Sequence, residues 1–284
     1  MDGGNTIAHN KPFTCDMVIA RYREKLDWLQ KFQKNAENDY NFRNIYLYNK
    51  WESDNNKTAA DLKCNLNGKE CVKINLKNEG RCDHTYLYHI VNNYDNLADV
   101  TIFTKGSSDM RRETTKLAFT VKWVFKTKNT VMSVDLHPVP LHIHAAHFGI
   151  GEYRSSHPDN HNGPFDINGM KMKLANPRPF GKWFQKHFPG VVITKAVYAG
   201  VFSVSKEHIY QHPKSYYQSF LEELEGHSNP EVGHYLERSW VAVFGPIPEE
   251  CLYNSIREHI GGGSRRKQTR KVKRRLKRRY SSKR

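Results

Sequence analysis

The chain has 284 residues and a formal net charge of +16, with aromatic residues making up 12% of the sequence. This length is sufficient for one large domain or two small ones, and the aromatic content excludes a mostly disordered protein. Residues 265–284 contain 13 Lys or Arg and no acidic residue, and subtracting these 13 charges from +16 leaves +3 for the rest. The basic character therefore belongs to a terminal segment, and the remainder is nearly balanced.

The first half of the chain predicts alternating strands and helices. Residues 1–12 are polar and predict a flexible leader. A buried strand over 17–22 precedes an amphipathic helix, and a second strand follows over 44–50. The stretch 51–70 is rich in Asn, Asp and Lys, and we expect an exposed insertion there.

The block 78–106 is the most informative part of the sequence. Asp83 is a suitable N-cap for a helix, and a β-prone run after the helix closes at Lys105. The turn before the helix contains Gly80 and Arg81. A flexible backbone and a guanidinium beside a helix N-terminus indicate an anion site. The alternative is a plain helix–strand connection with a surface arginine.

The second half is less regular. It predicts strands over 118–126 and 131–134, a long loop over 151–180, and a strand interrupted by Gly200 over 191–205. Helices are expected from about residue 205, over 213–225 and over 230–244, and a basic tail follows a glycine hinge over 259–284. The order of elements predicts a single α/β domain over 13–258 with a mostly parallel sheet.

The cysteines and the apolar runs bear on location. The five cysteines are odd in number and form no CxxC pair, which argues against a disulfide framework and for a reducing compartment. No apolar run approaches a membrane span, and the first ten residues lack the apolar core of a signal peptide. We therefore expect an intracellular, cytoplasmic protein, with nuclear location through the basic tail as the alternative.

Three segments, 18–29, 78–106 and 200–240, occur in an order that resembles a family of uncharacterised proteins. This family is a domain of unknown function common in fungi and also found in bacteria and large DNA viruses, and the resemblance covers about residues 15–245. The family is grouped with glycosyltransferases of the GT-A type. The resemblance implies a GT-A-like, Rossmann-like fold and a nucleotide-sugar donor at the carboxyl edge of the sheet.

The resemblance also implies roles for individual residues. Donor-binding residues would be Arg21, after the first strand, and Asn78, Gly80 and Arg81 around the turn, which could receive a diphosphate.

A carboxylate on the last helix would accept the proton of the acceptor hydroxyl, and we expect Glu237 in this role, with Glu231 second. The alternatives are a helix-dipole partner for Glu231 and a surface pair with Arg238 for Glu237.

The sequence departs from the family pattern at two places. Cys82 stands where family members usually have a Glu, and Ser107 follows Gly106 where an acidic residue is typical. GT-A enzymes commonly hold Mn²⁺ or Mg²⁺ there, because a hard cation on a diphosphate needs oxygen ligands. Only Asp109 is available as a metal ligand, and Lys105 is a candidate to neutralise the leaving diphosphate instead.

Two further patterns have competing interpretations. His142 and His144 would share a face if they lie on a strand, which is typical of a zinc or iron site, although a histidine-rich loop is the alternative. Phe180 and Trp183 lie beside Gly and Pro and could stack on an acceptor ring. A small satellite core is the competing explanation for these two rings.

The basic tail predicts polyanion binding by counterion release, with little sequence preference. It also resembles nuclear-localisation signals and the tails of proteins from large DNA viruses. The polyanion-binding residues would be Arg265, Arg266, Lys267, Arg270, Lys271, Lys273, Arg274 and Arg275.

The family resemblance, taken with these patterns, implies a nucleotide-sugar-dependent glycosyltransferase that acts on a glycan or another hydroxyl acceptor. The alternative is a catalytically degenerate GT-A-like binding module that its tail tethers to nucleic acid or to an acidic partner.

Overall fold

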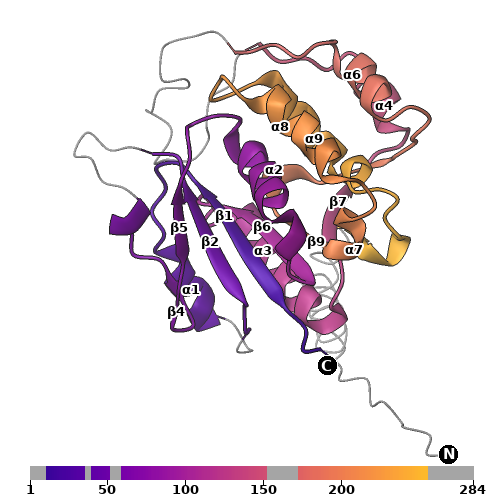
Figure 1. Cartoon of the computed structure of the whole chain (residues 1–284). Helices are drawn as coiled ribbons and strands as arrows, with labels where there is room; N and C mark the ends of the chain where they lie inside the picture. Colours follow the sequence, from indigo (N-terminus) through magenta and orange to yellow (C-terminus); the bar gives the residue numbers. More distant parts are fainter. Residues whose placement is uncertain (1–10, 36–39, 52–58, 152–171, 255–284) are drawn as a thin grey trace, which may run out of the picture.

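The computed structural model describes residues 11–35, 40–51, 59–151 and 172–254, and its centre is a five-stranded sheet (Figure 1). The strands lie in the order β5-β2-β1-β6-β9. Their bounds are β1 (Cys15–Arg21), β2 (Asn44–Asn49), β5 (Val72–Asn75), β6 (Val100–Lys105) and β9 (Phe202–Ser205). The first four are parallel and β9 runs antiparallel to β6. The predicted mixed α/β domain with a mostly parallel sheet is confirmed.

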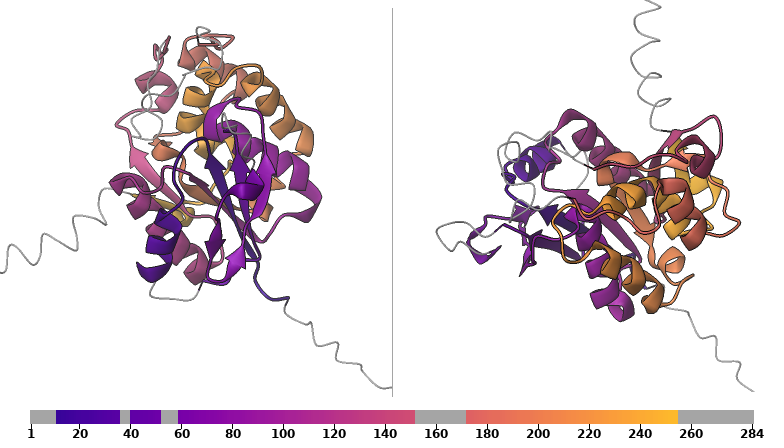
Figure 2. Two further views of the ribbon diagram at one scale, coloured as in Figure 1. Left: turned by 90° about the vertical axis from the view of Figure 1, so that its left-hand side faces the viewer. Right: turned by 90° about the horizontal axis from the view of Figure 1, so that it is seen from above.

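Helices cover both faces of the sheet, as the two views in Figure 2 show. Strand β1 explains why: Val18 and Ala20 join one hydrophobic cluster, whereas Met17 and Ile19 join the other, because side chains alternate along a strand. The first face is covered by α2 (Arg81–Asn93), α6 (Phe180–His187), α8 (Lys214–Leu224) and α9 (Glu231–Val243), and the second by α1 (Trp28–Asn35) and α3 (Arg111–Thr127).

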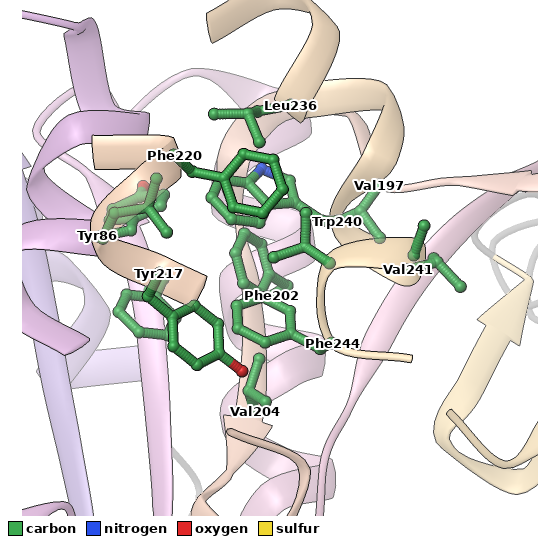
Figure 3. Packing of buried hydrophobic residues seen from close by; sticks show 14 of the residues in the cluster. Tyr86, Val197, Phe202, Val204, Tyr217, Phe220, Leu236, Trp240, Val241 and Phe244 are labelled. Carbon is green, nitrogen blue, oxygen red and sulfur yellow. The ribbon is translucent and has the colours of Figure 1, made fainter. Parts of the chain in front are cut away.

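The largest core is aromatic and lies between β9 and the helices α8 and α9 (Figure 3). The ring of Phe202 lies 5.2 Å from that of Trp240, which in turn stacks on Phe244 at 5.6 Å. From α2, the buried Tyr86 hydroxyl donates a 2.7 Å hydrogen bond to the carbonyl of Gly200. These contacts hold the segment before β9 against the first half of α2.

Shorter elements complete the structure. A second sheet has the order β10-β7-β8, and β3 and β4 form an antiparallel pair. Their bounds are β3 (Asn65–Leu66), β4 (Lys69–Glu70), β7 (Met132–Leu136), β8 (Lys195–Ala196) and β10 (Leu252–Asn254). The remaining helical segments are η1 (Ala59–Asp61), η2 (Tyr94–Asn96), α4 (Leu141–His144), η3 (Tyr198–Gly200), α7 (Lys206–Ile209) and η4 (Glu249–Cys251).

Three sequence predictions need correction. The strand expected over 118–126 is part of α3, because Leu117, Val121 and Val124 recur at helical spacing and are buried against the sheet. The predicted exposed insertion contains packed residues, since Leu66 is only 2% exposed. A disulfide joins Cys64 to Cys71, whereas the sequence argued against a disulfide framework.

Two of the predicted segments are at the ends of the chain. The leader, the tail and its predicted polyanion-binding residues lie outside the described residues, apart from residues 11 and 12 of the leader. Within the described ranges, no helix is both long and apolar enough to cross a membrane.

The strand order locates a site. From β1 the chain proceeds to β2 and β5 on one side, whereas β6 lies on the other side of β1. In open α/β sheets ligands bind outside the carboxyl ends of the strands at such a switch point. Here the switch point lies beside Arg21 and Lys105, the last residues of β1 and β6.

Candidate functional site

Arg21 lies at the switch point, and its guanidinium is bonded within the protein. Its Nε donates to the carbonyl of Glu24 at 2.7 Å and its Nη1 to Oδ1 of Asn49 at 2.6 Å. The side chain is 9% exposed. These bonds shape the loop after β1, and the predicted donor contact of Arg21 stays a prediction.

The loops after β1 and β6 are packed against each other. Gly106 donates a backbone hydrogen bond to Ala20, and the Trp28 indole donates to the carbonyl of Gly106 at 2.8 Å. A Cβ on Gly106 would lie 2.7 Å from a carboxylate oxygen of Glu24. Protein atoms thus fill the space between these loops, and the charged side chains gather on the neighbouring side, between α2 and α9.

The turn before α2 has an unusual backbone. Gly80 has φ 57° and Arg81 has φ 52°, so two consecutive residues are in the left-handed region. Their amides donate to the carbonyls of His227 and Ser228. The predicted N-cap, Asp83, is instead in the first turn of α2, and Gly80 occupies the cap position. Asn78 is half-buried in the bend before this turn.

No side chain fits at Gly80. A Cβ there would lie 2.6 Å from Cβ of His84 and 2.8 Å from Cβ of Leu224, at the end of α8. Real Cβ atoms do not approach this closely, and a left-handed φ adds a further cost for any other residue. The glycine is therefore required by both packing and conformation.

Asp83 is a buried carboxyl group in the first turn of α2, 4% exposed. Burial, and next the nearby Glu237, raise the pKa of Asp83 to about 7, while Arg81 acts in the opposite direction. Gly233 on α9 allows the approach, since a Cβ there would lie 3.4 Å from Oδ2 of Asp83. A carboxyl with a pKa near neutrality can both hold and release a proton at working pH.

Sequence reasoning missed Asp83 as a site residue. Its place after the Gly80–Arg81 turn was explained by helix capping, which accounts for an acidic residue without any further role. The available signal was the distant Glu237 on α9, whose charge helps to raise the pKa of Asp83. Asp83 and Glu237 come near each other only when the chain folds, so the sequence alone does not show this signal.

Glu237 is half-buried on α9, and its Oε1 accepts a 2.9 Å hydrogen bond from the backbone amide of Ala199. Its neighbour Arg238 packs its guanidinium 3.6 Å from the centre of the Phe148 ring and donates to the carbonyl of His234. Because the aromatic core fixes both α9 and the segment before β9, the carboxylate of Glu237 is held in a defined place.

Cationic side chains lie near the two carboxyl groups, since Arg81 acts to lower the pKa of Asp83 and Glu237 acts to raise that of Lys116. Nζ of Lys105 lies 3.2 Å from Oε1 of Glu113, and Arg81 lies 3.3 Å from Nε2 of His234. Lys116 is 6% exposed and burial lowers its pKa to about 8. We call the group the edge cluster; it comprises Arg81, Asp83, Lys105, Lys116 and Glu237.

Gly200 brings part of the edge cluster together. A Cβ there would lie 3.3 Å from Sγ of Cys82 and 3.5 Å from Cδ of Lys105. Both Lys105 and Cys82 therefore approach η3 closely, and Lys105 lowers the pKa of the Cys82 thiol against a larger opposing effect of burial. Of the residues predicted from sequence, Arg81, Lys105 and Glu237 are thus in one place.

Glu231 is outside the edge cluster. It is fully buried, and its two oxygens accept hydrogen bonds from Arg178 and from the backbone amides of Ile150 and Ala175. Six residues along a helix correspond to about 240° of rotation, so Glu231 and Glu237 project from different sides of α9. Glu231 is thus an anchor that binds neighbouring segments to the start of α9, and it does not lie beside Glu237.

The two predicted acceptor-stacking rings are in the main core. Phe180 and Trp183 are each 0% exposed, and the Trp183 indole donates to a carboxylate oxygen of Glu223 at 2.8 Å. Neither ring has an exposed face on which a sugar could stack. The core explanation suits them, although the core they join is the main one and not a satellite.

The histidine pair is on a short helix, not on a strand. In α4, His142 stacks on Phe184, and the His144 ring lies 4.7 Å from that of His137. Residues two positions apart on a helix point to different sides. His142 and His144 therefore do not share the face that the metal hypothesis needed. Among the residues that the structure describes, no group of three His, Cys, Asp or Glu could hold a metal ion.

The turn after β6 contains Asp109, the predicted metal ligand, as an exposed residue. Ser107 and Ser108 beside it are buried, and the hydroxyls of Ser108 and Thr104 share a 2.6 Å hydrogen bond. The turn therefore directs hydroxyl groups inward at the place where a carboxylate pair would hold a hard cation. Of the carboxylate ligands that a hard cation such as Mn²⁺ or Mg²⁺ uses, this turn provides one, Asp109.

Comparison with protein families identifies one match. The family model described as "Protein of unknown function (DUF3431)" matches residues 17–256, and the chain belongs to this family. Neither the curated proteins nor the solved structures contain a match. The expected membership of an uncharacterised family is thereby confirmed, and the grouping with glycosyltransferases stays a prediction.

The packing at Gly80 predicts a large loss of stability in Gly80→Ala. We expect the free energy of unfolding to fall by roughly 3 kcal/mol, because overpacking and a left-handed Cβ both contribute. Gly68→Ala is the matched control: it has φ 76° but open space around a Cβ, and should cost about 1 kcal/mol. Urea denaturation measures both, and equal losses would contradict the packing argument.

The raised pKa of Asp83 predicts a pH-dependent effect of Asp83→Asn. The folded state holds the Asp83 proton more tightly than the unfolded chain does, so the contribution of this group to stability is lost as pH rises from about 4 through 7. Asparagine does not titrate. Relative to the unmodified protein, the variant should gain on the order of 2 kcal/mol between pH 4 and pH 8. A pH-independent difference in denaturation would argue against a buried titrating carboxyl.

Proposed function

We propose that this DUF3431 protein is a nucleotide-sugar-dependent glycosyltransferase that acts on a hydroxyl acceptor. The observation that supports the proposal best is the edge cluster, which combines two carboxyl groups with cationic side chains at the carboxyl edge of a parallel sheet. Donor binding needs positive charge for a diphosphate, and transfer needs a group that accepts the acceptor proton. The cluster contains both kinds of group within one small region.

The donor side would be formed by Arg81, Lys105 and the amino end of α2. A helix N-terminus favours anions, and cationic side chains strengthen bonds to phosphate oxygens. Arg21 and Asn78 would contribute indirectly, since Arg21 shapes the loop after β1 and Asn78 precedes the turn. This side of the cluster would neutralise the diphosphate as it leaves.

The acceptor side would use the carboxyl pair. Glu237 is the proposed base, held by the amide of Ala199, and the acceptor hydroxyl would lose its proton to it as the sugar is transferred. Asp83, whose pKa is raised to about 7, could hold or release a proton beside this base at working pH.

The proposal assigns no step to a metal ion. Asp109 is the one acidic residue in the turn after β6 over residues 106–110, all of which the structure describes. A hard cation would need further oxygen ligands that this turn does not provide. Charge neutralisation by Lys105 and Arg81 is therefore the arrangement that the described residues favour.

The experiment is a donor screen with the full chain. Hydrolysis and transfer are measured over a panel of nucleotide sugars, with and without Mn²⁺. Glu237→Gln should reduce turnover by about a hundredfold or more, the usual contribution of a general base. Glu207→Gln, an exposed glutamate on α7, is the control and should change nothing. If no donor binds or turns over, or if Glu237→Gln matches the control, the assignment is refuted.

The alternative is a catalytically degenerate binding module. The buried hydroxyls of Ser107 and Ser108 favour it, because they occupy the turn where the family typically has an acidic residue. In that case deletion of 265–284 should abolish nucleic-acid binding and leave the melting temperature nearly unchanged. Fluorescence anisotropy with a labelled oligonucleotide measures this, and tight binding by the truncated chain would contradict a tail-based tether.

A further inference from the structure

Lys50 is a buried lysine whose ammonium bonds to backbone carbonyls. It follows β2 directly and is 5% exposed. Its Nζ donates one hydrogen bond to the carbonyl of Glu79 and one to that of Arg81, each 2.5 Å long. These carbonyls stand on either side of Gly80. One buried cation therefore spans the turn from which α2 starts.

The turn that Lys50 spans needs such support. Arg81 is left-handed, which costs an L-residue with a Cβ roughly 1–2 kcal/mol, and such conformations persist only where the surroundings enforce them. On one side, the amides of the turn bond to the carbonyls of His227 and Ser228. On the other side, the turn's own carbonyls point to Lys50. The turn is held between β2 and the segment before α9.

We propose that Lys50 is a positioning residue: its ammonium fixes the Gly80–Arg81 turn and thereby sets where Arg81 and the first turn of α2 lie. Arg81 contacts His234, and Asp83 in the first turn lies near enough to Glu237 for that charge to raise its pKa, so both halves of the edge cluster depend on this geometry. The consequence for phosphate binding rests on the proposed function, whereas the consequence for the turn does not.

The charge of Lys50 changes with pH near neutrality. Burial lowers the pKa of Lys50 to about 7, and Cys82, Asp83 and Glu79 act in the opposite direction. His84 also faces it, and Lys50 helps to lower the pKa of that imidazole to about 3. A charged donor forms hydrogen bonds roughly twice as strong as a neutral one. The turn should therefore be held more firmly below pH 7 than above it.

The first test measures the turn directly, by amide hydrogen exchange with mass spectrometry. Lys50→Met should speed exchange in residues 79–84 at least tenfold. Lys69→Met is the matched control, because Lys69 also donates to two backbone carbonyls, those of Phe42 and Arg43, far from the turn. It should leave exchange over 79–84 unchanged. Unchanged exchange in Lys50→Met would overturn the proposal.

A measurement on the unmodified protein covers the case in which Lys50→Met does not fold. After correction for intrinsic exchange rates, the protection of residues 79–84 should fall between pH 6 and pH 8 relative to that of β2. The same fall should occur in Asp83→Asn, which lacks the other group of this turn that titrates in this range. A constant ratio of the two protections would count against the proposal that Lys50 holds the turn.

The second test uses inorganic pyrophosphate as the probe, with binding measured by calorimetry at pH 6 and pH 8. The ratio of the Kd of Lys50→Met to that of the unmodified protein should be about tenfold at pH 6 and shrink towards unity at pH 8. The ionisation of the probe is the same with both proteins and cancels in this ratio. A merely structural role would give a ratio that does not change with pH.

The outcomes separate the two proposals. If the unmodified protein does not bind pyrophosphate, the donor-phosphate assignment fails, and hydrogen exchange still decides whether Lys50 holds the turn. If the unmodified protein binds the probe and Lys50→Met binds it equally well, Lys50 is not a positioning residue for this site.

Discussion

The close approach of α2 to the end of α8 at Gly80 is the constraint on which the site depends. Gly80 has no room for a side chain, and both Gly80 and Arg81 have a left-handed backbone. This turn determines where the helix begins. Asp83 then lies in the first helical turn, buried and directed towards α9. The aromatic core between β9 and α9 fixes the opposite side, so Glu237 meets Asp83 from a separate element.

The edge cluster lowers the stability of the fold, because it contains buried ionisable groups with perturbed pKa values. This cost bears on whether the cluster has a function. Asp83, whose pKa is raised to about 7, and Lys116, whose pKa is lowered to about 8, are groups that the fold keeps partly uncharged or poorly solvated. Such arrangements lower stability and occur preferentially where function needs them, although structural networks also produce them. The contrast with Glu231 is useful. That carboxylate is equally buried, but Arg178 and two backbone amides satisfy it, as is usual for an anchor.

Sequence patterns predicted those elements whose hydrophobic period is clear, such as β1, β2, α8 and α9, and hence the parallel sheet. They failed where local composition and tertiary packing disagree. The β-branched and aromatic residues over 118–126 favour a strand locally, but helical spacing against the sheet decides the outcome. Of the site, Arg81, Lys105 and Glu237 were predicted, whereas Asp83 and Lys50 were not. Their roles arise only from contacts between residues distant in sequence.

The anchor at Glu231 joins residues that are distant in the sequence. Its carboxylate accepts hydrogen bonds from the amide of Ile150 and from Ala175 and Arg178, so these residues meet at the start of α9. Because one buried carboxylate serves all three donors, its loss would leave two backbone amides and a guanidinium without this acceptor at once, and an unsatisfied buried donor is costly.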